Sequence, residues 1–551
     1  MLNQYLVKFG KKNIFLFCCL LFVYQNFLII FSSIEGDEIF GIQLKGLNLN
    51  LNYDILEYVL RETIFWLIQG DTSPLSTLQQ IIFYYYFQDP LTIKLFYLFL
   101  LFISVFVFYL FIKINIQNEY FALTFFLIIS VFFQYQLWHD AFLIFPLYVI
   151  PHFILLITSL ICYSLFLKKN DNNYKVFSII LLLIAFCYTT IATVPIIPAY
   201  FLLLFHYKKK IDIKELKEIL IISAIFVFIV IYFKFFFNNE SYLFDLLNNI
   251  QNREINYNYD GRILEFNPIL NIYTLIIQTF GSLPISTFFR GEGFTFKFYD
   301  LIYLISFFCI LKFFLSKFNR ITDNNLNFLF YFALILIISA APVSLSQKYI
   351  DQLINKGFGF SYIYVFFQYF GMALFFLIFF KKLKVNTNIF CILISVLALI
   401  TITSNRTIVE TNSVTKNYDI SLIKKAAKKN FFSEVGEFSN VYFENSLISN
   451  LNSPQFLSTH LNKNIFSNYY SIRLTDYVLV DKVIKLKKSK FSKNFYLLNN
   501  LQVKNIESNR YLIEKKNRNL AFNVASPELR NLKKNIIVFN DKEKKQILNN
   551  S

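Results

Sequence analysis

Two carboxylates come directly after the first long apolar run of the chain. Asp37 and Glu38 lie in segment 34–40 (IEGDEIF), and the apolar run before them covers about 14–34. A carboxylate can accept the proton of an attacking hydroxyl or amine, and two carboxylates can share a divalent metal ion. Such groups cost several kcal/mol at the centre of a bilayer and little at its edge. Asp37 and Glu38 are therefore candidates for a base or for metal ligands, with an ordinary solvated acidic loop as the alternative.

The elements that position these residues are membrane spans. Hydrophobic residues make up 56% of the chain, aromatic residues 20%, and the mean hydropathy is +0.49. Runs long enough to cross about 30 Å of hydrocarbon recur along residues 1–404, which predicts a polytopic α-helical membrane protein. After the first run, the predicted spans cover about 91–112, 119–137, 141–167, 176–192, 193–207, 218–237, 299–318, 325–345, 361–380 and 387–404. Together they give about eleven transmembrane helices.

Basic residues indicate the orientation of these spans. Lys8, Lys11 and Lys12 precede the first run, so the N-terminus is expected in the cytoplasm, and the run lacks a cleavage site and is expected to stay as an anchor. The later basic clusters also fall inside, provided that 268–289 does not cross the membrane. We therefore interpret 268–289 as a re-entrant or interfacial segment. The C-terminus is then extracytoplasmic.

Two helical segments are predicted between the first and second spans, in a first outer loop covering 35–90. In 51–68, Asp54, Glu57 and Arg61 share one helical face, which predicts a helix on the membrane surface. The motif DTSPL at 71–75 then interrupts the chain, because Pro74 disfavours helix at the residue before it and can begin a new helix. An aromatic interfacial helix is predicted from there to Phe87.

The order of these parts resembles the GT-C superfamily of integral-membrane glycosyltransferases. More narrowly, it resembles the lipid A aminoarabinose transferases, protein O-mannosyltransferases and related bacterial enzymes. In that branch an Asp-Glu pair opens the first outer loop, and a His-Pro-Pro-Leu-type motif precedes the second span. Here TSPL at 72–75 occupies that motif with Thr72 at the His position, and YYYFQDP at 84–90 leads into the second span. The resemblance covers about residues 10–210, and beyond them it is one of topology only.

The resemblance implies a sugar transfer at the outer face of a bacterial cytoplasmic (inner) membrane. The donor would be a polyprenyl-phosphate sugar, and the acceptor a lipid, a glycan or a protein. Asp37 is the implied general base, and Glu38 and Asp140 are implied as supporting carboxylates or as ligands of a divalent cation, Mg²⁺ or Mn²⁺, where the enzyme uses one. Asp140 ends the motif QLWHD at 136–140, which falls where the family tends to carry an acidic or Arg-containing motif, at the outer end of spans three and four.

Positive groups must stabilise the phosphate that leaves in such a reaction. The outer-face candidates for substrate binding are Arg262, Arg290, Lys348 and Lys356, and each could instead be an ordinary loop residue. Arg290 is the best of them, because it is followed by Gly291-Glu292-Gly293 in the predicted outer segment 238–298. His139 is a further substrate-binding candidate, with an interfacial histidine beside Trp138 as the alternative.

Composition argues against several other functions. Most of the net charge of +18 lies after residue 404 and comes from Lys, which fits codon bias better than nucleic-acid binding, while contact with anionic membrane lipids stays open. The six cysteines lie in or beside apolar runs, so neither a disulfide framework nor a zinc site is expected.

The tail, 405–551, is long enough for one small extracytoplasmic α+β domain. A short helix is predicted at 419–429 and strands at 441–444, 477–480 and 511–514.

Other membrane functions remain as alternatives. A polysaccharide polymerase or ligase would use large outer loops, and 238–298 could be one. A transporter of cell-envelope glycans would place polar residues inside its spans, whereas most spans here are apolar throughout. A noncatalytic polytopic membrane protein would show the same hydropathy.

Overall fold

The computed structural model describes twelve ranges of residues between 11 and 415, and six strands after them. They are residues 11–32, 38, 55–68, 74–87, 89–136, 140–210, 213–232, 266–281, 283–284, 294–317, 321–356 and 364–415, and the strands at 439–443, 465–466, 478–479, 501–507, 510–515 and 537–538. The chain forms two compact units, one of residues 1–31, 59–80 and 91–408, and one of residues 32–58, 81–90 and 409–551.

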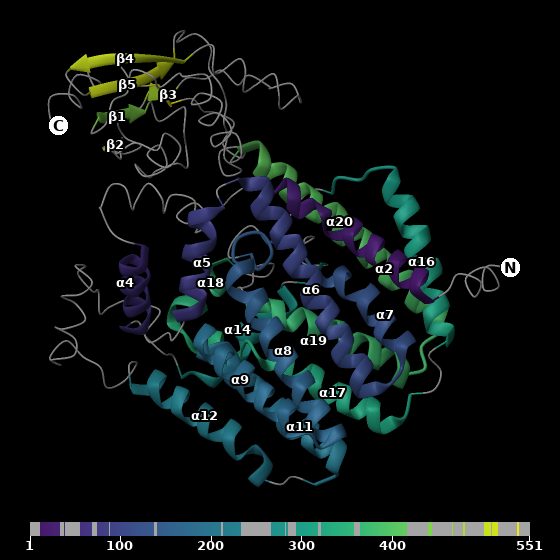
Figure 1. The fold of residues 1–551 in the computed structure, drawn as a ribbon. Helices are drawn as coiled ribbons and strands as arrows, with labels where there is room; N and C mark the ends of the chain where they lie inside the picture. The colour runs from purple at the N-terminus through teal and green to yellow at the C-terminus, as the bar shows by residue number, and fades with distance from the viewer. Residues whose placement is uncertain are drawn as a thin grey trace. The chain divides into compact units, whose positions relative to one another are not determined.

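Eight helices in the described part of the chain are long and apolar enough to cross a membrane, which confirms a polytopic helical membrane protein. They are α2 (Lys11–Asn26) continued by η1 (Phe27–Phe31), α6 (Pro90–Ile116), α8 (Pro146–Lys169), the run of α10 (Thr190–Thr193), η3 (Val194–Ile196) and α11 (Pro198–Lys208), α16 (Tyr299–Lys317), α17 (Asp323–Ile338) with η6 (Ala341–Leu345), α19 (Val365–Lys382) and α20 (Thr387–Thr415) (Figure 1).

The remaining three predicted spans are also helical, but they are shorter or more charged. α7 (Glu119–Ile129), extended by η2 (Ser130–Phe132), and α9 (Asn172–Tyr188) are apolar helices below the length of the other eight. The third, α12 (Ile213–Ile231), carries two lysines and two glutamates in its first two turns. The total of eleven spans therefore stays a prediction.

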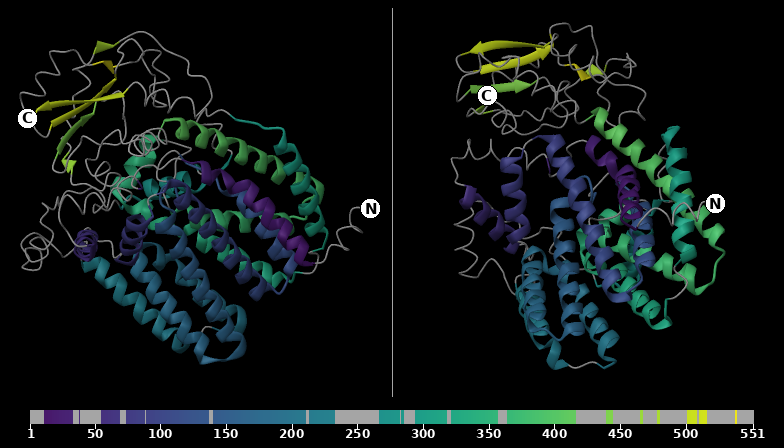
Figure 2. Two further views of the ribbon diagram at one scale, coloured as in Figure 1. Left: turned by 45° about the horizontal axis from the view of Figure 1, so that its top comes forward. Right: turned by 45° about the vertical axis from the view of Figure 1, so that its right-hand side comes forward.

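Local signals in the sequence explain the tight turn between α8 and α9. Asn170 ends α8 in the left-handed conformation, with φ 55°. Asp171 then caps α9, because its side chain accepts a hydrogen bond of 2.9 Å from the backbone N–H of Asn173. The two helices lie side by side as a hairpin (Figure 2).

Four shorter helices belong to the connecting segments: α4 (Ile55–Ile68), α5 (Pro74–Tyr86), α14 (Pro268–Gly281) and α18 (Gln347–Lys356). The first two confirm that helices occur where an amphipathic helix at 51–68 and an aromatic helix up to Phe87 were predicted. α14 has 14 residues, so it is about 21 Å long and falls short of a bilayer core of about 30 Å. This length is the one expected of a segment that does not cross, while residues 285–289 lie outside the described part.

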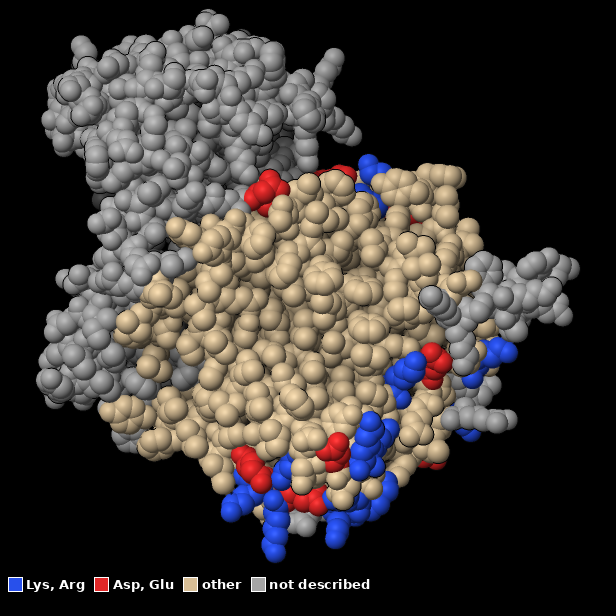
Figure 3. Space-filling model, in the orientation of Figure 1, with Lys and Arg blue, Asp and Glu red and all other residues tan. Residues whose placement is uncertain are grey.

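Several basic residues that are predicted to lie on the cytoplasmic side contact neighbouring helices at one end of the bundle. Lys168 donates to the carbonyl of Ile114, Asn325 to that of Ile116 at 3.4 Å, and Lys382 to the side chain of Asn327 at 2.8 Å. Further ion pairs join Lys175 of α9 to Glu218 of α12, and Lys208 of α11 to Glu215 of α12. We call this the basic end. Figure 3 shows the charged side chains gathered at the lower end of the visible face, with few in the band above.

Close aromatic packing fills the centre of the helical unit. The ring centroids of Phe153 and Phe370 lie 4.3 Å apart, and those of Phe111 and Phe332 lie 4.7 Å apart. All four side chains are fully buried. The helices α6, α8, α17 and α19 that carry them therefore share one interior, and α2, α16 and α20 pack beside it.

The second unit contains a four-stranded sheet in the order β2-β1-β5-β4, made of β1 (Ser439–Phe443), β2 (Ile465–Phe466), β4 (Leu501–Glu507) and β5 (Arg510–Lys515). β1 pairs in parallel with β2 and β5, and β4 and β5 form an antiparallel hairpin. A separate pair joins β3 (Val478–Leu479) to β6 (Ile537–Val538).

Strands thus occur at the three predicted positions, while the predicted helix at 419–429 lies outside the described residues, and an α+β domain stays a prediction. The predicted domain boundary at 404 falls inside α20, which continues to Thr415.

Candidate functional site

Asp140 organises the loop that joins η2 to α8. Its Oδ1 accepts hydrogen bonds of 2.6 Å from the backbone N–H groups of Phe142 and Leu143, and its Oδ2 accepts one from the N–H of Gln136. The side chain is fully buried. Three charge-assisted bonds to backbone donors hold the loop in a tight turn around the carboxylate.

A lysine on α6 reaches the same loop. Lys94 is fully buried, its Nζ donates to the carbonyl of Leu143 at 2.5 Å, and the amine lies 4.9 Å from the centroid of the Tyr97 ring. Since Leu143 also donates its N–H to Asp140, a basic and an acidic side chain meet at one residue of the loop. Lys94 comes four positions after the start of α6, whose far end carries Lys113, so this is the end of the bundle opposite the basic end. We call it the polar end.

Amide side chains tie the loop to the last helix. The Oδ1 of Asn405 on α20 accepts from the side chain of Gln134 at 2.9 Å and from the N–H of Tyr135 at 2.8 Å. The Nδ2 of Asn405 donates to the carbonyl of Phe133 at 2.8 Å, and the hydroxyl of Tyr369 on α19 donates to that of Gln134 at 3.0 Å. Side chains from α19 and α20 thus replace the backbone partners that the chain loses when η2 ends.

Tyr135 is the group whose ionisation this environment changes most clearly. It is fully buried, and burial raises the pKa of its phenol well above the ordinary value, with the nearby charge of Asp140 acting in the same direction. The phenol therefore stays neutral and keeps its proton, and its hydroxyl donates to the carbonyl of Asn26 on α2 at 3.4 Å.

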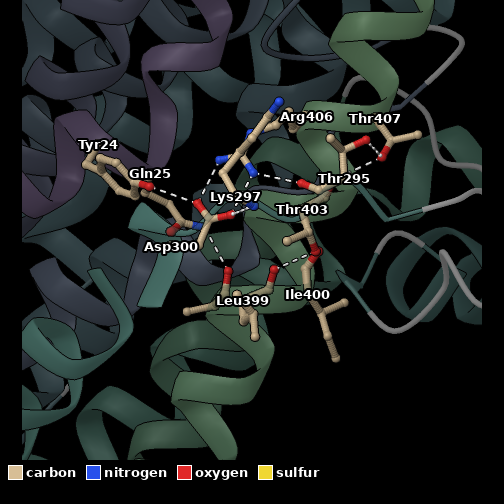
Figure 4. Close-up of polar contacts among 11 residues, drawn as sticks. Tyr24, Gln25, Thr295, Lys297, Asp300, Leu399, Ile400, Thr403, Arg406 and Thr407 are labelled. Atoms are coloured by element: carbon tan, nitrogen blue, oxygen red, sulfur yellow. Dashed lines mark hydrogen bonds and ion pairs between the residues drawn. The ribbon is translucent and has the colours of Figure 1, made fainter. Parts of the chain in front are cut away.

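A second buried group lies where α2, α16 and α20 meet (Figure 4). The guanidinium of Arg406 binds the carboxylate of Asp300 through two nitrogens, each 2.7 Å from its oxygen. The hydroxyl of Tyr24 donates to the same carboxylate at 2.8 Å. Asp300 is fully buried and Arg406 is 2% exposed, so the pair is removed from solvent.

Half of the predicted site residues cannot be placed. Asp37, His139, Arg262 and Arg290 lie outside the described residues. Of the others, Glu38 is buried in the second unit, and Lys348 and Lys356 are residues of α18 in the first. Asp140 is the predicted residue whose contacts are the best defined, and its bonds to three backbone amides give it a role in holding the loop. Its predicted role as a catalytic or metal-binding carboxylate stays a prediction.

The described residues contain no group of three His, Cys, Asp or Glu side chains close enough to hold a metal ion. Asp37, on which the predicted divalent cation depends, is outside that set, so the cation also stays a prediction.

The prediction missed Lys94, Asp300, Asn405 and Arg406. A signal for the first was present, because Lys94 is the only charged residue of the predicted span 91–112, and a lone charge in a span marks a functional or structural polar contact. Asn405 and Arg406 directly follow the predicted last span at 387–404 and were assigned to the tail.

Comparison of the chain with protein-family models, with curated proteins and with solved structures gives no match. Its function therefore has to be inferred from its residues and their arrangement.

Proposed function

We propose that the protein is a membrane glycosyltransferase that transfers a sugar from a polyprenyl-phosphate donor to a lipid, glycan or protein acceptor. The observation that carries the proposal is the order of motifs along residues 10–90. An Asp-Glu pair follows the first span, an amphipathic helix and TSPL come next, and the second span begins at Pro90. The helical membrane fold and the helices α4 and α5 between the first two spans support it.

A lipid-linked donor imposes a location on the reaction. Its polyprenyl tail stays in the hydrocarbon, so its phosphate and sugar lie at the membrane surface, near the ends of the helices. The polar end gathers buried Lys94, Asp140 and Asn405 near the first residues of α6 and α8 and the last turns of α20. A few ordered polar groups at one end of an otherwise aromatic bundle suit a site that binds the phosphate and sugar of a donor lying in the membrane beside the helices.

The proposed reaction is a displacement at the anomeric carbon of the sugar. The acceptor hydroxyl or amine gives its proton to Asp37 as it attacks, a new bond forms from its oxygen or nitrogen to the anomeric carbon, and the bond from that carbon to the phosphate oxygen breaks. Polyprenyl phosphate leaves with the electron pair of that bond. Arg290, and with it Arg262, Lys348 and Lys356, would stabilise the charge on the phosphate, and His139 and Glu38 would contact substrate or orient the base.

The buried charges also bear on the transporter alternative. A transporter is expected to hold polar groups near the bilayer midplane. Lys94 lies in the second turn of a 27-residue helix, and Asp300 is the second residue of α16. Charges at helix ends fit chemistry at the membrane surface better than a pathway through the bundle.

The test replaces Asp37 by Asn. The amide keeps the shape of the carboxylate but cannot accept the proton, so we expect sugar transfer to fall by roughly 10²–10⁴-fold. Transfer from a lipid-linked donor is measured in membranes of a deletion strain that expresses each variant at matched level. Asp54→Asn, in the same predicted outer loop, is the control and should keep its activity. Full activity of Asp37→Asn would remove the base from the proposed mechanism, and absence of any transfer by the unaltered protein would remove the function itself.

A further inference from the structure

The chain segment that enters α16 is joined to residues 403–407 of α20 by a set of hydrogen bonds (Figure 4). The N–H of Thr295 donates to the carbonyl of Thr403 at 3.3 Å, and the hydroxyls of Thr295 and Thr407 lie 3.0 Å apart. The guanidinium of Arg406 donates to the carbonyl of Thr295 at 2.7 Å. Thr295 is therefore held against residues 403–407 of a helix more than a hundred positions later in the sequence.

Asp300 connects this segment to two further helices. Its carboxylate accepts both nitrogens of Arg406 on α20, the hydroxyl of Tyr24 on α2, and the N–H of Lys297 at 2.8 Å. These four donors use both oxygens of the carboxylate. Both members of the ion pair therefore bind the backbone of the same segment. Arg406 donates to the carbonyl of Thr295, and Asp300 accepts from the N–H of Lys297.

Stability alone is a poor reason for such a pair. Removing two charges from water costs about as much as their attraction returns, and apolar side chains of the same size often pack as well. A bidentate pair does fix geometry, because the planar guanidinium meets the carboxylate in one orientation. The arrangement therefore suits a role in which the position of residues 294–298 matters.

We propose that Arg406 and Asp300 are positioning residues that fix the end of the predicted outer segment 238–298 against α20. Arg290, the best candidate for binding the donor phosphate, comes five positions before Thr295. The functional part of this inference rests on the proposed glycosyltransferase activity, whereas the fixation of the segment does not.

Disulfide trapping tests the fixation directly. The facing hydroxyls of Thr295 and Thr407 suit a cysteine pair, so Thr295→Cys/Thr407→Cys in the full chain should link under mild oxidation. The yield is measured by mass spectrometry of the linked peptides. Thr295→Cys/Thr387→Cys, with the second cysteine at the other end of α20, is the control and should not link. Failure of the first pair to link would overturn the proposed fixation.

The role of the ion pair is tested by replacing it with apolar side chains. In a background carrying Asp300→Leu and Arg406→Met, we expect the protein to stay folded and the linking rate of the cysteine pair to fall at least fivefold. Arg406→Lys, which keeps the charge but loses the two-nitrogen contact, provides a milder variant and should give an intermediate rate. An unchanged linking rate in both backgrounds would show that the pair does not hold the segment, and would overturn the proposal.

Rescue separates positioning from other roles. Sugar transfer by the apolar variant should fall by tenfold or more and should recover when the disulfide between the two introduced cysteines is formed. Loss of transfer that the disulfide does not restore would overturn a positioning role. If neither the variants nor the unaltered protein transfer sugar while the linking rates change as expected, the proposed function fails and the fixation by Arg406 and Asp300 stands.

Discussion

Replacing Asp140 by Asn separates a structural from a catalytic role for this residue. In the native loop, Oδ1 serves the N–H groups of Phe142 and Leu143, and Oδ2 serves that of Gln136. Asparagine has one oxygen in place of two. Its amide oxygen can keep the first two donors, but its NH₂ group then faces the N–H of Gln136, and two donors repel.

The expected cost follows from this geometry. One charge-assisted hydrogen bond, worth about 1.5–3 kcal/mol, is lost, and a buried N–H without an acceptor costs about 1–3 kcal/mol more. Part of this cost is relieved when the loop adjusts, so we expect the variant to lose about 3 kcal/mol of stability, which corresponds to roughly 100-fold in the folding equilibrium.

The measurement is the thermal unfolding midpoint of the full chain in detergent, compared with that of Asp171→Asn. Asp171 makes the same kind of bond to the backbone N–H of Asn173, but at the exposed cap of α9, where Asn is as good a cap as Asp. The control should therefore unfold at the native midpoint and Asp140→Asn well below it. A variant Asp140→Asn that is as stable as the native protein but has lost sugar transfer would refute the structural role and make Asp140 a catalytic or metal-binding group.

Two further predictions concern packing and topology. A Cβ on Gly371 of α19 would lie 2.8 Å from the carbonyl oxygen of Ala333 and 2.9 Å from the Cβ of Leu336 on α17. Gly371→Ala should therefore lower the unfolding midpoint, by a net cost of about 1 kcal/mol after the gain in helix propensity, and an equal or higher midpoint would contradict the close approach of the two helices. A reporter active only outside the cytoplasm should be active after Ser551 and silent after Lys210, because the basic end is predicted to face the cytoplasm. The reverse pattern would exclude the predicted orientation.

The helices of the membrane part could be predicted from the sequence because hydropathy is a local property. Where the structure differs from the predicted spans, the cause is polar side chains that allow a helix to end within an apolar run. α7 and η2 end at Phe132, and the next residues, Phe133 to Gln136, form a loop whose backbone groups are bound by side chains of α19 and α20. In the sequence, these residues extend the apolar run to 137, so hydropathy does not show that the helix ends at Phe132.

The contacts that shape the polar end could not be predicted in the same way. The side chain of Asn405 binds residues 133–135, and Arg406 binds Asp300, so each contact joins positions that are more than a hundred residues apart. The sequence does not single out Asn405 or Arg406. Asn is abundant in this chain, and both residues follow an apolar run that is long enough to be a complete span at 404.

The sequence does show which polar residues of a span would be costly to bury without hydrogen-bond partners. An asparagine and an arginine that continue a membrane helix must find partners or raise its energy, because the bilayer offers none. Asn405 and Arg406 therefore continue α20 within the first unit, although they directly follow the apolar run that ends at 404. The same reasoning gives Lys94 its importance: a lysine buried in the second turn of an otherwise apolar helix identifies the end of the bundle where polar partners have to be sought.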